Sequence, residues 1–357
     1  MRLLQRRFAL VAALVVAAAV GAGVAMATTT ATDSNAYVVH NLTSDVPGLA
    51  DHTDPNLVNA WGLDALSLGP WWVADNGTDV STLYVADGTP QSLVVTVHNA
   101  PTGLVGNPTA SFVITKNGHS GPAVFLFSTE TGKILGWNSG VSGSGSVVAV
   151  NRSGAGAIYK GLAISTSAGR LYATDFHNGA VDVWDGNFNQ INDPNAFVDP
   201  NLPRRYAPFG IQTIGSSVFV TYAKQDAAKV DEVAGPHLGV VDEYDTSGNL
   251  ITRVATGGPL NAPWGLALAP SDFGRFSNDL LVGNFGDGKI NGYTPQSGTY
   301  NKHGGLKAPG GALIAIDGLW ALEFGKGGNP NGPKNTLFFT AGPEDETHGL
   351  FGSIVAQ

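Results

Sequence analysis

Short apolar runs recur along the whole chain and are separated by turns rich in Gly, Asp and Asn. The runs at 170–174 and 180–184 show the pattern most clearly, because apolar and small or polar positions alternate with the period of two that a half-buried strand requires. Amphipathic runs with the 3.6-residue period of a long helix do not occur. The pattern predicts an all-β chain built from short antiparallel strands.

A small residue opens the first strand of each repeating unit. The six positions are Gly62, Ala110, Gly161, Gly210, Gly265 and Ala321. Six repeats of four short strands are typical of a β-propeller, whose innermost strands crowd around a central channel and leave little room for a large side chain. The sequence therefore predicts a six-bladed β-propeller of four-stranded antiparallel blades.

The two ends of the chain are expected to close this ring. The sixth unit has strand-like runs at 319–324, 336–340 and 350–355, and the chain then ends one strand short. A further run at 37–42 precedes the first unit and has no place in it. We expect this N-terminal run to supply the missing strand, because ring closure buries an edge that would otherwise be exposed. Residues 37–357 are thus predicted to form one domain.

The N-terminus has the features of an export signal. Arg2, Arg6 and Arg7 precede an apolar run over residues 8–24, and Ala25-Met26-Ala27 provides small residues at a peptidase site. The alternative is an uncleaved membrane anchor, and the adjacent arginines leave both general secretion and twin-arginine export open.

The domain boundaries and the location follow from this interpretation. Residues 1–27 are predicted to be a cleaved signal peptide and residues 28–36 a flexible segment. We expect a protein that is secreted or held in the cell envelope or periplasm, with no membrane span after cleavage.

The net charge and the lack of cysteine limit the classes of molecule that the protein is expected to bind. The formal net charge is −9, and removal of a signal that contains arginines would make it more negative. Such a surface repels nucleic acid and anionic lipid and favours cations or basic partners. The chain has no cysteine, which excludes disulfides and thiolate metal sites. The expected partners are a small molecule, a glycan or a protein, and the domain is expected to be a monomer.

The turns between the second and third strands of the units carry most of the polar side chains. We expect these turns and the entries to the innermost strands to share one face of the disc. The candidate ligand-binding residues are Asp75, Asn76, Asp175, Tyr222, Lys224, Asn284 and Asp287, together with Trp61 and Trp264 at two blade starts. Turn geometry alone also explains Asp and Asn at such positions, and the aromatic residues can equally pack one blade against the next.

Two histidines in these turns are candidates for catalysis. His177 and His348 lie among carboxylates, where imidazole can transfer protons or bind a metal. The oxygen ligands for Ca²⁺ or another divalent metal would be Asp75, Asp175, Asn284 and Glu344. A solvated acidic turn at 344–346 is the alternative. The insertion at 224–238 lies at the same rim and is a candidate lid or specificity loop.

Several segments resemble an uncharacterised family of exported bacterial propellers. The matching segments are residues 42–45, 54–63, 107–109 and 261–265. The resemblance extends more distantly to NHL-repeat and TolB-like six-bladed proteins, and it implies the fold and export without implying a reaction. Six-bladed relatives include calcium-dependent lactonases, but the first blade here lacks the matching Glu. Streptogramin-type lyases use a His and a metal at a place comparable to His177 or His348.

The sequence leaves enzymatic activity open. It contains no Gly-x-Ser-x-Gly elbow, no phosphate-binding loop with Gly-Lys-Ser/Thr and no His-Glu-x-x-His. The leading hypothesis is therefore a propeller that binds a small ligand, glycan or protein at its channel face. The alternative is a metal-dependent lyase or lactonase-like hydrolase that uses the same face, and a third hypothesis is an envelope module whose acidic rim meets a basic partner.

Overall fold

The computed structural model describes residues 34–357. The predicted signal peptide and most of the predicted segment at 28–36 lie outside the described residues. Within the described range, none of the helices has the length and apolar character needed to cross a membrane.

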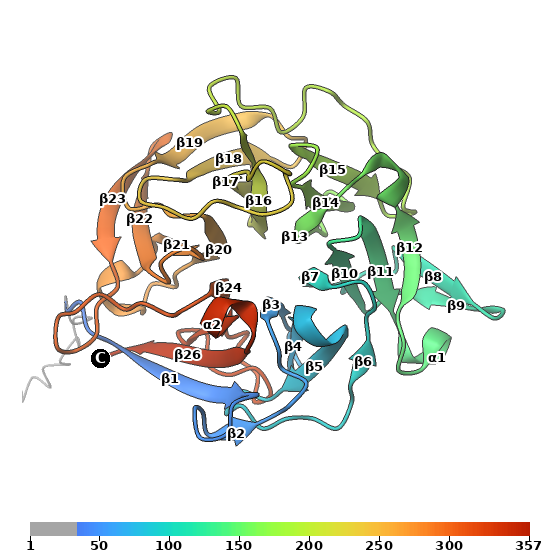
Figure 1. The fold of residues 1–357 in the computed structure, drawn as a ribbon, viewed down its shortest axis with the longest axis horizontal. Helices are drawn as coiled ribbons and strands as arrows, with labels where there is room; N and C mark the ends of the chain where they lie inside the picture. The colour runs from blue at the N-terminus through green and yellow to red at the C-terminus, as the bar shows by residue number, and fades with distance from the viewer. Residues whose placement is uncertain (1–33) are drawn as a thin grey trace, which may run out of the picture. The chain divides into compact units, whose positions relative to one another are not determined.

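The strands form six small sheets that stand side by side around a centre, so the prediction of a six-bladed β-propeller is confirmed (Figure 1). The first blade contains β3 (Ala60–Asp64), β4 (Trp71–Asp75), β5 (Val80–Tyr84) and β6 (Val95–Thr96). The second contains β7 (Pro101–Gly106), β10 (Phe125–Thr129), β11 (Lys133–Trp137) and β12 (Val147–Asn151). The third contains β13 (Tyr159–Ser165), β14 (Arg170–Asp175) and β15 (Ala180–Asp185).

The second half of the ring repeats this arrangement. The fourth blade contains β16 (Tyr206–Ile214), β17 (Ser217–Lys224), β18 (Val240–Asp245) and β19 (Leu250–Thr256). The fifth contains β20 (Pro263–Leu268), β21 (Leu280–Asn284), β22 (Ile290–Gln296) and β23 (Thr299–Gly305). The sixth contains β24 (Leu319–Phe324), β25 (Leu337–Ala341), β26 (Leu350–Ala356), β1 (Tyr37–Ser44) and β2 (His52–Thr53).

A short hairpin and several short helices lie in the connections between the strands. A hairpin of β8 (Val113–Lys116) and β9 (His119–Pro122) is inserted between β7 and β10. The helices are α1 (Ser139–Ser142), α2 (Pro343–Glu346) and single 3₁₀ turns at Asn76–Thr78, Ser153–Ala155 and Gly274–Phe276.

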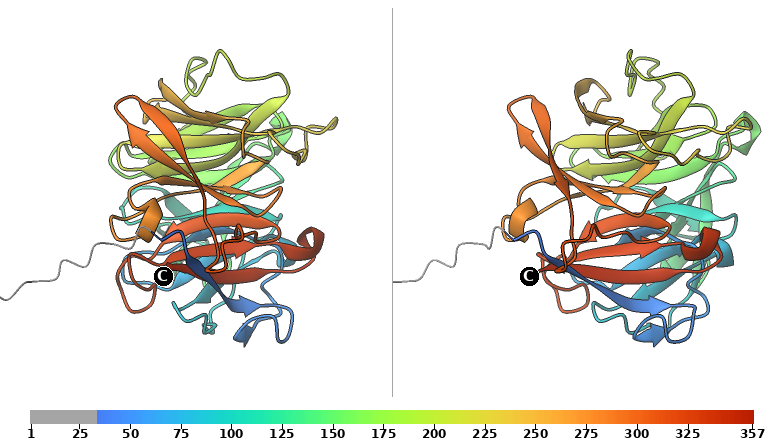
Figure 2. Two further views of the ribbon diagram at one scale, coloured as in Figure 1. Left: turned by 90° about the vertical axis from the view of Figure 1, so that its left-hand side faces the viewer. Right: turned by 60° about the vertical axis from the view of Figure 1, so that its left-hand side comes forward.

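The N-terminal strand closes the ring as predicted. β1 pairs antiparallel with β26, from Tyr37 opposite Ala356 to Ser44 opposite Leu350. The Tyr37 ring is fully buried and its hydroxyl donates to the Phe273 carbonyl at 2.8 Å. Figure 2 shows β1 and β26 side by side in both views. The pairing with β1 covers the edge of β26 that would otherwise be exposed.

The prediction for the start of the second blade was wrong. Its innermost strand is β7, with Gly103 at the inner position, and Ala110 lies in the loop that follows. The Pro and Gly residues of β7 resemble turn punctuation, which hides the strand in the sequence. A Cβ atom at Gly103 would collide with the main-chain nitrogen of Leu162 in the next blade, so the close approach of the two inner strands requires glycine there.

An aromatic cluster forms where the starts of several inner strands meet. Trp61 and Trp320 stack with ring centroids 3.5 Å apart, Trp264 meets both edge-on, and Phe285 stacks on Trp320 at 4.1 Å. Trp61 is 2% exposed and Trp264 is 9% exposed. The aromatic side chains at the starts of these blades therefore pack the blades against one another.

Candidate functional site

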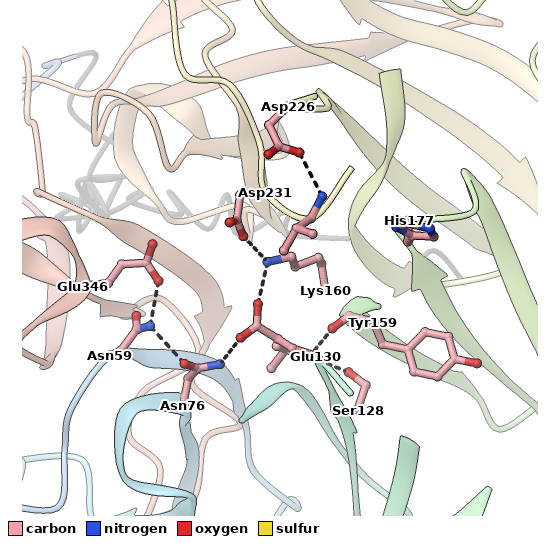
Figure 3. Close-up of polar contacts among 12 residues, drawn as sticks. Asn59, Asn76, Ser128, Glu130, Tyr159, Lys160, His177, Asp226, Asp231 and Glu346 are labelled. Carbon is pink, nitrogen blue, oxygen red and sulfur yellow. Dashed lines mark hydrogen bonds and ion pairs between the residues drawn. The ribbon is translucent and has the colours of Figure 1, made fainter. Parts of the chain in front are cut away.

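A buried lysine lies at the centre of one channel mouth. Lys160 on β13 is 1% exposed, and its Nζ donates to Glu130 Oε1 at 2.6 Å and to Asp231 Oδ1 at 3.0 Å. The same ammonium lies 5.2 Å from the centroid of the Trp61 ring, which adds a cation–π contact. Figure 3 shows Lys160 between the two carboxylates. The ion pairs compensate for the burial of the charge.

A chain of hydrogen bonds extends from this ion pair across the mouth (Figure 3). Asn76 Nδ2 donates to the second oxygen of Glu130 at 3.2 Å. Asn59 Nδ2 donates to Asn76 Oδ1 at 3.2 Å and to Glu346 Oε2 at 2.7 Å. We call Asn59, Asn76, Glu130, Lys160, Asp231 and Glu346 the channel-face network.

Four turns between second and third strands supply this network. Asn76 follows β4, Glu130 follows β10, Asp231 lies in the insertion after β17, and Glu346 ends α2 after β25. Figure 2 shows α2 and the loop after β17 on the same side of the disc. The hydrogen bonds between them confirm that these turns converge on one face.

Two indole groups tie the network to the aromatic cluster below it. Trp264 Nε1 donates to the main-chain oxygen of Lys160 at 3.0 Å, and Trp320 Nε1 donates to Asn59 Oδ1 at 3.1 Å. The polar atoms at the mouth are therefore held by side chains that are themselves fixed by packing. Such support preorganises a binding surface, because little ordering remains to be done when a ligand arrives.

The carboxylates around Lys160 have perturbed acidities. Burial raises the pKa of Glu232 to about 7, although the nearby Lys160 charge opposes this effect. Burial also raises the pKa of Glu346. Burial by itself would lower the pKa of Lys160, but the carboxylates of Glu130, Glu232 and Asp231 outweigh it and raise the pKa. At neutral pH the lysine is charged and Glu232 is close to its titration midpoint.

The insertion after β17 is fastened to its neighbours. Gln225 Nε2 donates to the Phe176 carbonyl at 2.5 Å, and Gly235 N donates to Asn261 Oδ1 at 2.6 Å. Within the insertion, Asp226 Oδ1 accepts from Val230 N at 2.9 Å. These bonds hold the loop so that Asp231 reaches Lys160.

The two predicted catalytic histidines lie outside the network. His177 Nδ1 is 3.2 Å from the Lys229 carbonyl, and the side chain lies to one side of the network in Figure 3. His348 Nδ1 is 2.8 Å from Asp45 Oδ2, and this hydrogen bond raises the pKa of His348. Among the described residues, no hydrogen bond or ion pair joins either histidine to Lys160.

Three of the predicted polar residues, Asp175, Asn284 and Asp287, make hydrogen bonds within or next to their own blades. Asp175 Oδ1 accepts from the backbone N–H groups of Ile158 and Asn178, at 3.2 and 3.1 Å. Asn284 Nδ2 donates to the Pro259 carbonyl at 2.8 Å and to Asp287 Oδ1 at 2.9 Å. These are the turn-stabilising contacts that Asp and Asn commonly make.

The other predicted residues are also dispersed. Asp75 is fully buried at the end of β4, and burial raises its pKa well above the usual range. The Tyr222 hydroxyl bonds to Tyr244 inside the fourth blade at 2.6 Å. Lys224 ends β17, where its main-chain oxygen accepts from Val233 N, and Glu344 is 78% exposed. Of the predicted ligand-binding residues, the structure places Asn76 in the network and Trp61 and Trp264 directly against Lys160.

The predicted metal ligands come from four different blades. Asp75, Asp175 and Asn284 each end the second strand of a different blade, and Glu344 lies on the solvent side of α2. In residues 34–357 no three His, Cys, Asp or Glu side chains form a group that could hold a metal ion. At the mouth, Glu130 and Asp231 are engaged by the Lys160 ammonium, and Glu346 accepts from Asn59.

The central residues of the network escaped the sequence analysis. Lys160 sits within an apolar strand next to Gly161, and nothing in the sequence marks it as the meeting point of distant turns. Glu130, Asp231 and Glu346 lie in turns whose composition is polar, but that composition does not single them out as site residues. A lone lysine in the inner strand of a propeller was the signal that could have found the site, because a buried charge needs partners.

Solved structures with a similar fold come from several functional classes. An inactive variant of virginiamycin B lyase from Staphylococcus aureus, solved with quinupristin, has a TM-score of 0.51 and is 16% identical, covering 84% of this chain and 80% of its own. A luciferin-regenerating enzyme has a TM-score of 0.53 and is 13% identical, covering 90% and 95%. At these identities the likeness shows the six-bladed fold alone.

Sequence relatives lie much closer. No family model matches the chain. Uncharacterized protein R648 of Acanthamoeba polyphaga mimivirus is 32% identical over 332 residues, which span 89% of this chain and 79% of the relative. Uncharacterized protein L690 of the same virus is 32% identical over 340 residues, spanning 89% and 86%. These viral relatives do not bear on the expected bacterial origin or on the NHL-repeat and TolB-like resemblance. The chain belongs to the family of propellers that includes these two mimivirus proteins.

Proposed function

We propose that the channel-face network binds a small polar ligand with a cationic amine or several hydrogen-bond donors. The observation that carries the proposal is the imbalance at the mouth, where a single buried ammonium, Lys160, is in contact with Glu130 and Asp231 while Glu346 also points into the network. The surplus of carboxylate oxygens attracts cations and accepts hydrogen bonds.

The state of Lys160 favours binding over covalent chemistry. A buried amine acts as a nucleophile when its pKa is lowered, whereas the surrounding carboxylates raise the pKa of Lys160. The lysine therefore works as a fixed cation that orients the acidic side chains around it. Export of the domain to the envelope or medium, inferred from the N-terminal residues, would place this mouth in contact with extracellular solutes.

The binding proposal can be tested with two sugars that differ in charge. Calorimetric titration is expected to detect glucosamine, which carries an amine, and to give at least tenfold weaker binding for N-acetylglucosamine. The Glu346→Gln variant should weaken glucosamine binding about fivefold, corresponding to about 1 kcal/mol. Glu344→Gln is the matched control, because it removes a charge from the same turn at a position that is 78% exposed.

Two results would contradict the proposal. One is the absence of binding by either sugar and by spermidine, a simple polyamine, at millimolar concentration. The other is equal loss of affinity in Glu346→Gln and Glu344→Gln, since general attraction by the acidic face would then explain the binding.

A lyase or lactonase-like activity is the second candidate. It is favoured by one property of the site, the pKa of Glu232 near 7, which suits a general acid or base at neutral pH. Linearisation of quinupristin, followed by mass spectrometry, is a direct assay because a lyase of similar fold was solved with that compound. Activity that disappears in Glu232→Gln and persists in Glu344→Gln would support it, and no turnover over several hours would reject it for this substrate.

A further inference from the structure

The third blade lacks the outer strand that completes the other blades. It ends with β15, which is the outermost labelled strand of its blade in Figure 1. The chain beyond β15 pairs with it only briefly, through a bridge between Trp184 and Gln190 and a hydrogen bond from Ile191 N to the Val183 carbonyl at 2.8 Å. It then turns away, so the first half of β15 is an unpaired strand edge.

The first blade shows what normally covers this edge. There the chain after β5 makes the same initial contacts, a bridge between Tyr84 and Pro90 and a hydrogen bond from Gln91 N to the Leu83 carbonyl. It continues into β6, where Val95 pairs with Ser81. By this correspondence Val181 in the third blade stands where Ser81 stands in the first.

The free backbone groups of β15 point outward. Neighbouring residues of a strand direct their N–H and C=O groups to opposite edges. Val183 accepts at the outer edge and Asp185 donates there, so Val181 also presents its N–H and C=O at that edge. In the part of the chain that the structure describes, neither outward group of Val181 has a hydrogen-bond partner.

A groove lies along the unpaired half of β15. It has a volume of about 420 Å³ and is bounded by the strand on one side and residues 190–198 on the other. Val181, Ile191 and Val198 give it apolar walls, and Phe197 anchors the far side by packing between Tyr172 and Tyr244. The groove is the place that β6 fills in the first blade.

We propose that this groove binds an extended, basic segment of a partner protein, which pairs with β15 as an added outer strand. The backbone groups of Val181 supply the pairing, and an apolar side chain of the segment enters the groove as the fully buried Val95 does in the first blade. Asp182 and Asp193 line the groove, and no Lys or Arg does. Asp182 already accepts from Tyr159 and Gln190 and lies 3.5 Å from Arg152 Nε, so the exposed Asp193 is the carboxylate that favours a basic residue in the segment.

Charge also argues against a second copy of this chain as the occupant. A second β15 edge would bring two acidic residues, Asp182 and Asp185, and no basic residue toward Asp193. Like charges brought close together repel each other. A basic segment instead neutralises the exposed Asp193 side chain.

The test uses the hexapeptide acetyl-Lys-Thr-Val-Thr-Lys-Thr-amide and a control peptide with Glu in place of both lysines. Titration of the ¹⁵N-labelled protein is expected to shift the amide signals of residues 180–182 and to slow hydrogen exchange at Val181. The Val181→Pro variant should weaken binding at least tenfold, because proline removes the outward N–H without breaking the β14 pairing.

Matched variants separate pairing from general charge attraction. Asp193→Asn keeps the hydrogen bond to Asn195 N and should weaken binding about threefold, whereas Asp272→Asn, an exposed residue in the fifth blade, should leave it unchanged. Equal binding of the Glu peptide, or undiminished binding in Val181→Pro, would overturn the proposal. Dimerisation of the free protein that Val181→Pro abolishes would overturn it in favour of a second copy as the occupant.

Discussion

The two ends of the central channel each hold a lysine among carboxylates, but they are built differently. At the opposite mouth Lys326 Nζ lies 2.7 Å from Glu323 and 3.5 Å from Asp64, and Gln212 donates to Glu323 at 2.7 Å. Glu323, Gln212 and Asp64 belong to inner strands, and Lys326 follows β24 by two residues and is 29% exposed.

The contrast shows that a propeller can use one end of its channel to hold the blades together and the other end to bind a ligand. The Lys326 cluster joins one ammonium to the carboxylates of Glu323 and Asp64, with Gln212 as a further partner, and fastens the sixth blade to the first and fourth. The turns that meet at Lys160 come from four blades and bring more carboxylates than one ammonium can neutralise. Function is expected at the mouth that loops build, because loops vary while the scaffold stays constant.

The largest expected effect is the loss of the buried ammonium. Lys160→Met leaves Glu130 and Asp231 without their common partner and should lower the free energy of unfolding by about 3 to 5 kcal/mol. Lys326→Met should cost about 1 to 2 kcal/mol, because the Lys326 side chain is 29% exposed whereas that of Lys160 is 1% exposed. Urea denaturation measures both, and equal losses would remove the distinction between the two mouths.

The second prediction concerns the close contact between neighbouring inner strands, which line the channel between the two mouths. A Cβ atom at Gly210 would collide with the Trp264 carbonyl of the next blade, so Gly210→Ala should lower stability by about 1 to 3 kcal/mol. Gly154→Ala is the control, because nothing lies within 4 Å of its added Cβ atom. Thermal unfolding tests this, and an unchanged midpoint for Gly210→Ala would show that the inner strands can separate freely.

The third prediction is that the free energy of unfolding depends on pH through Glu232, which lies at the Lys160 mouth. Because burial raises the pKa of Glu232 to about 7, folding favours its protonated form. The resulting stability is fully present below the ordinary glutamate pKa and is lost as the pH rises through 7, by about 1 to 2 kcal/mol. Glu232→Gln should flatten this part of the profile measured by urea denaturation between pH 5 and 8. A profile that keeps its slope in the variant would place the titration elsewhere.

The smallest effect is expected at the rim of the same mouth. The hydrogen bond with Asp45 raises the pKa of His348, so NMR titration should find this histidine protonated at higher pH than an ordinary one. Asp45→Asn should return the pKa of His348 toward its usual value, because the hydrogen bond to the carboxylate is then lost. No change in His348 would mean that the ion pair does not form in solution.

The sequence predicted the fold because the repeat is local. Alternation within strands and small residues at Gly62, Gly161, Gly210 and Gly265 report directly on the inner ring, and the prediction failed at the second blade where Gly103 sits among turn-like residues. The site depends on contacts between residues far apart in the chain, such as Asn59 with Glu346. Turn composition identified the correct loops but could not tell Glu130 or Asp231 from residues that merely cap turns.

The most direct test of the central claim is to locate glucosamine on the protein by NMR. Binding at the channel-face network should shift the indole N–H signals of Trp264 and Trp320, because these groups hold Lys160 and Asn59. The backbone amides of Glu323 and Lys326 at the opposite mouth should not move. Shifts confined to that opposite mouth, or no shifts at either, would contradict the account.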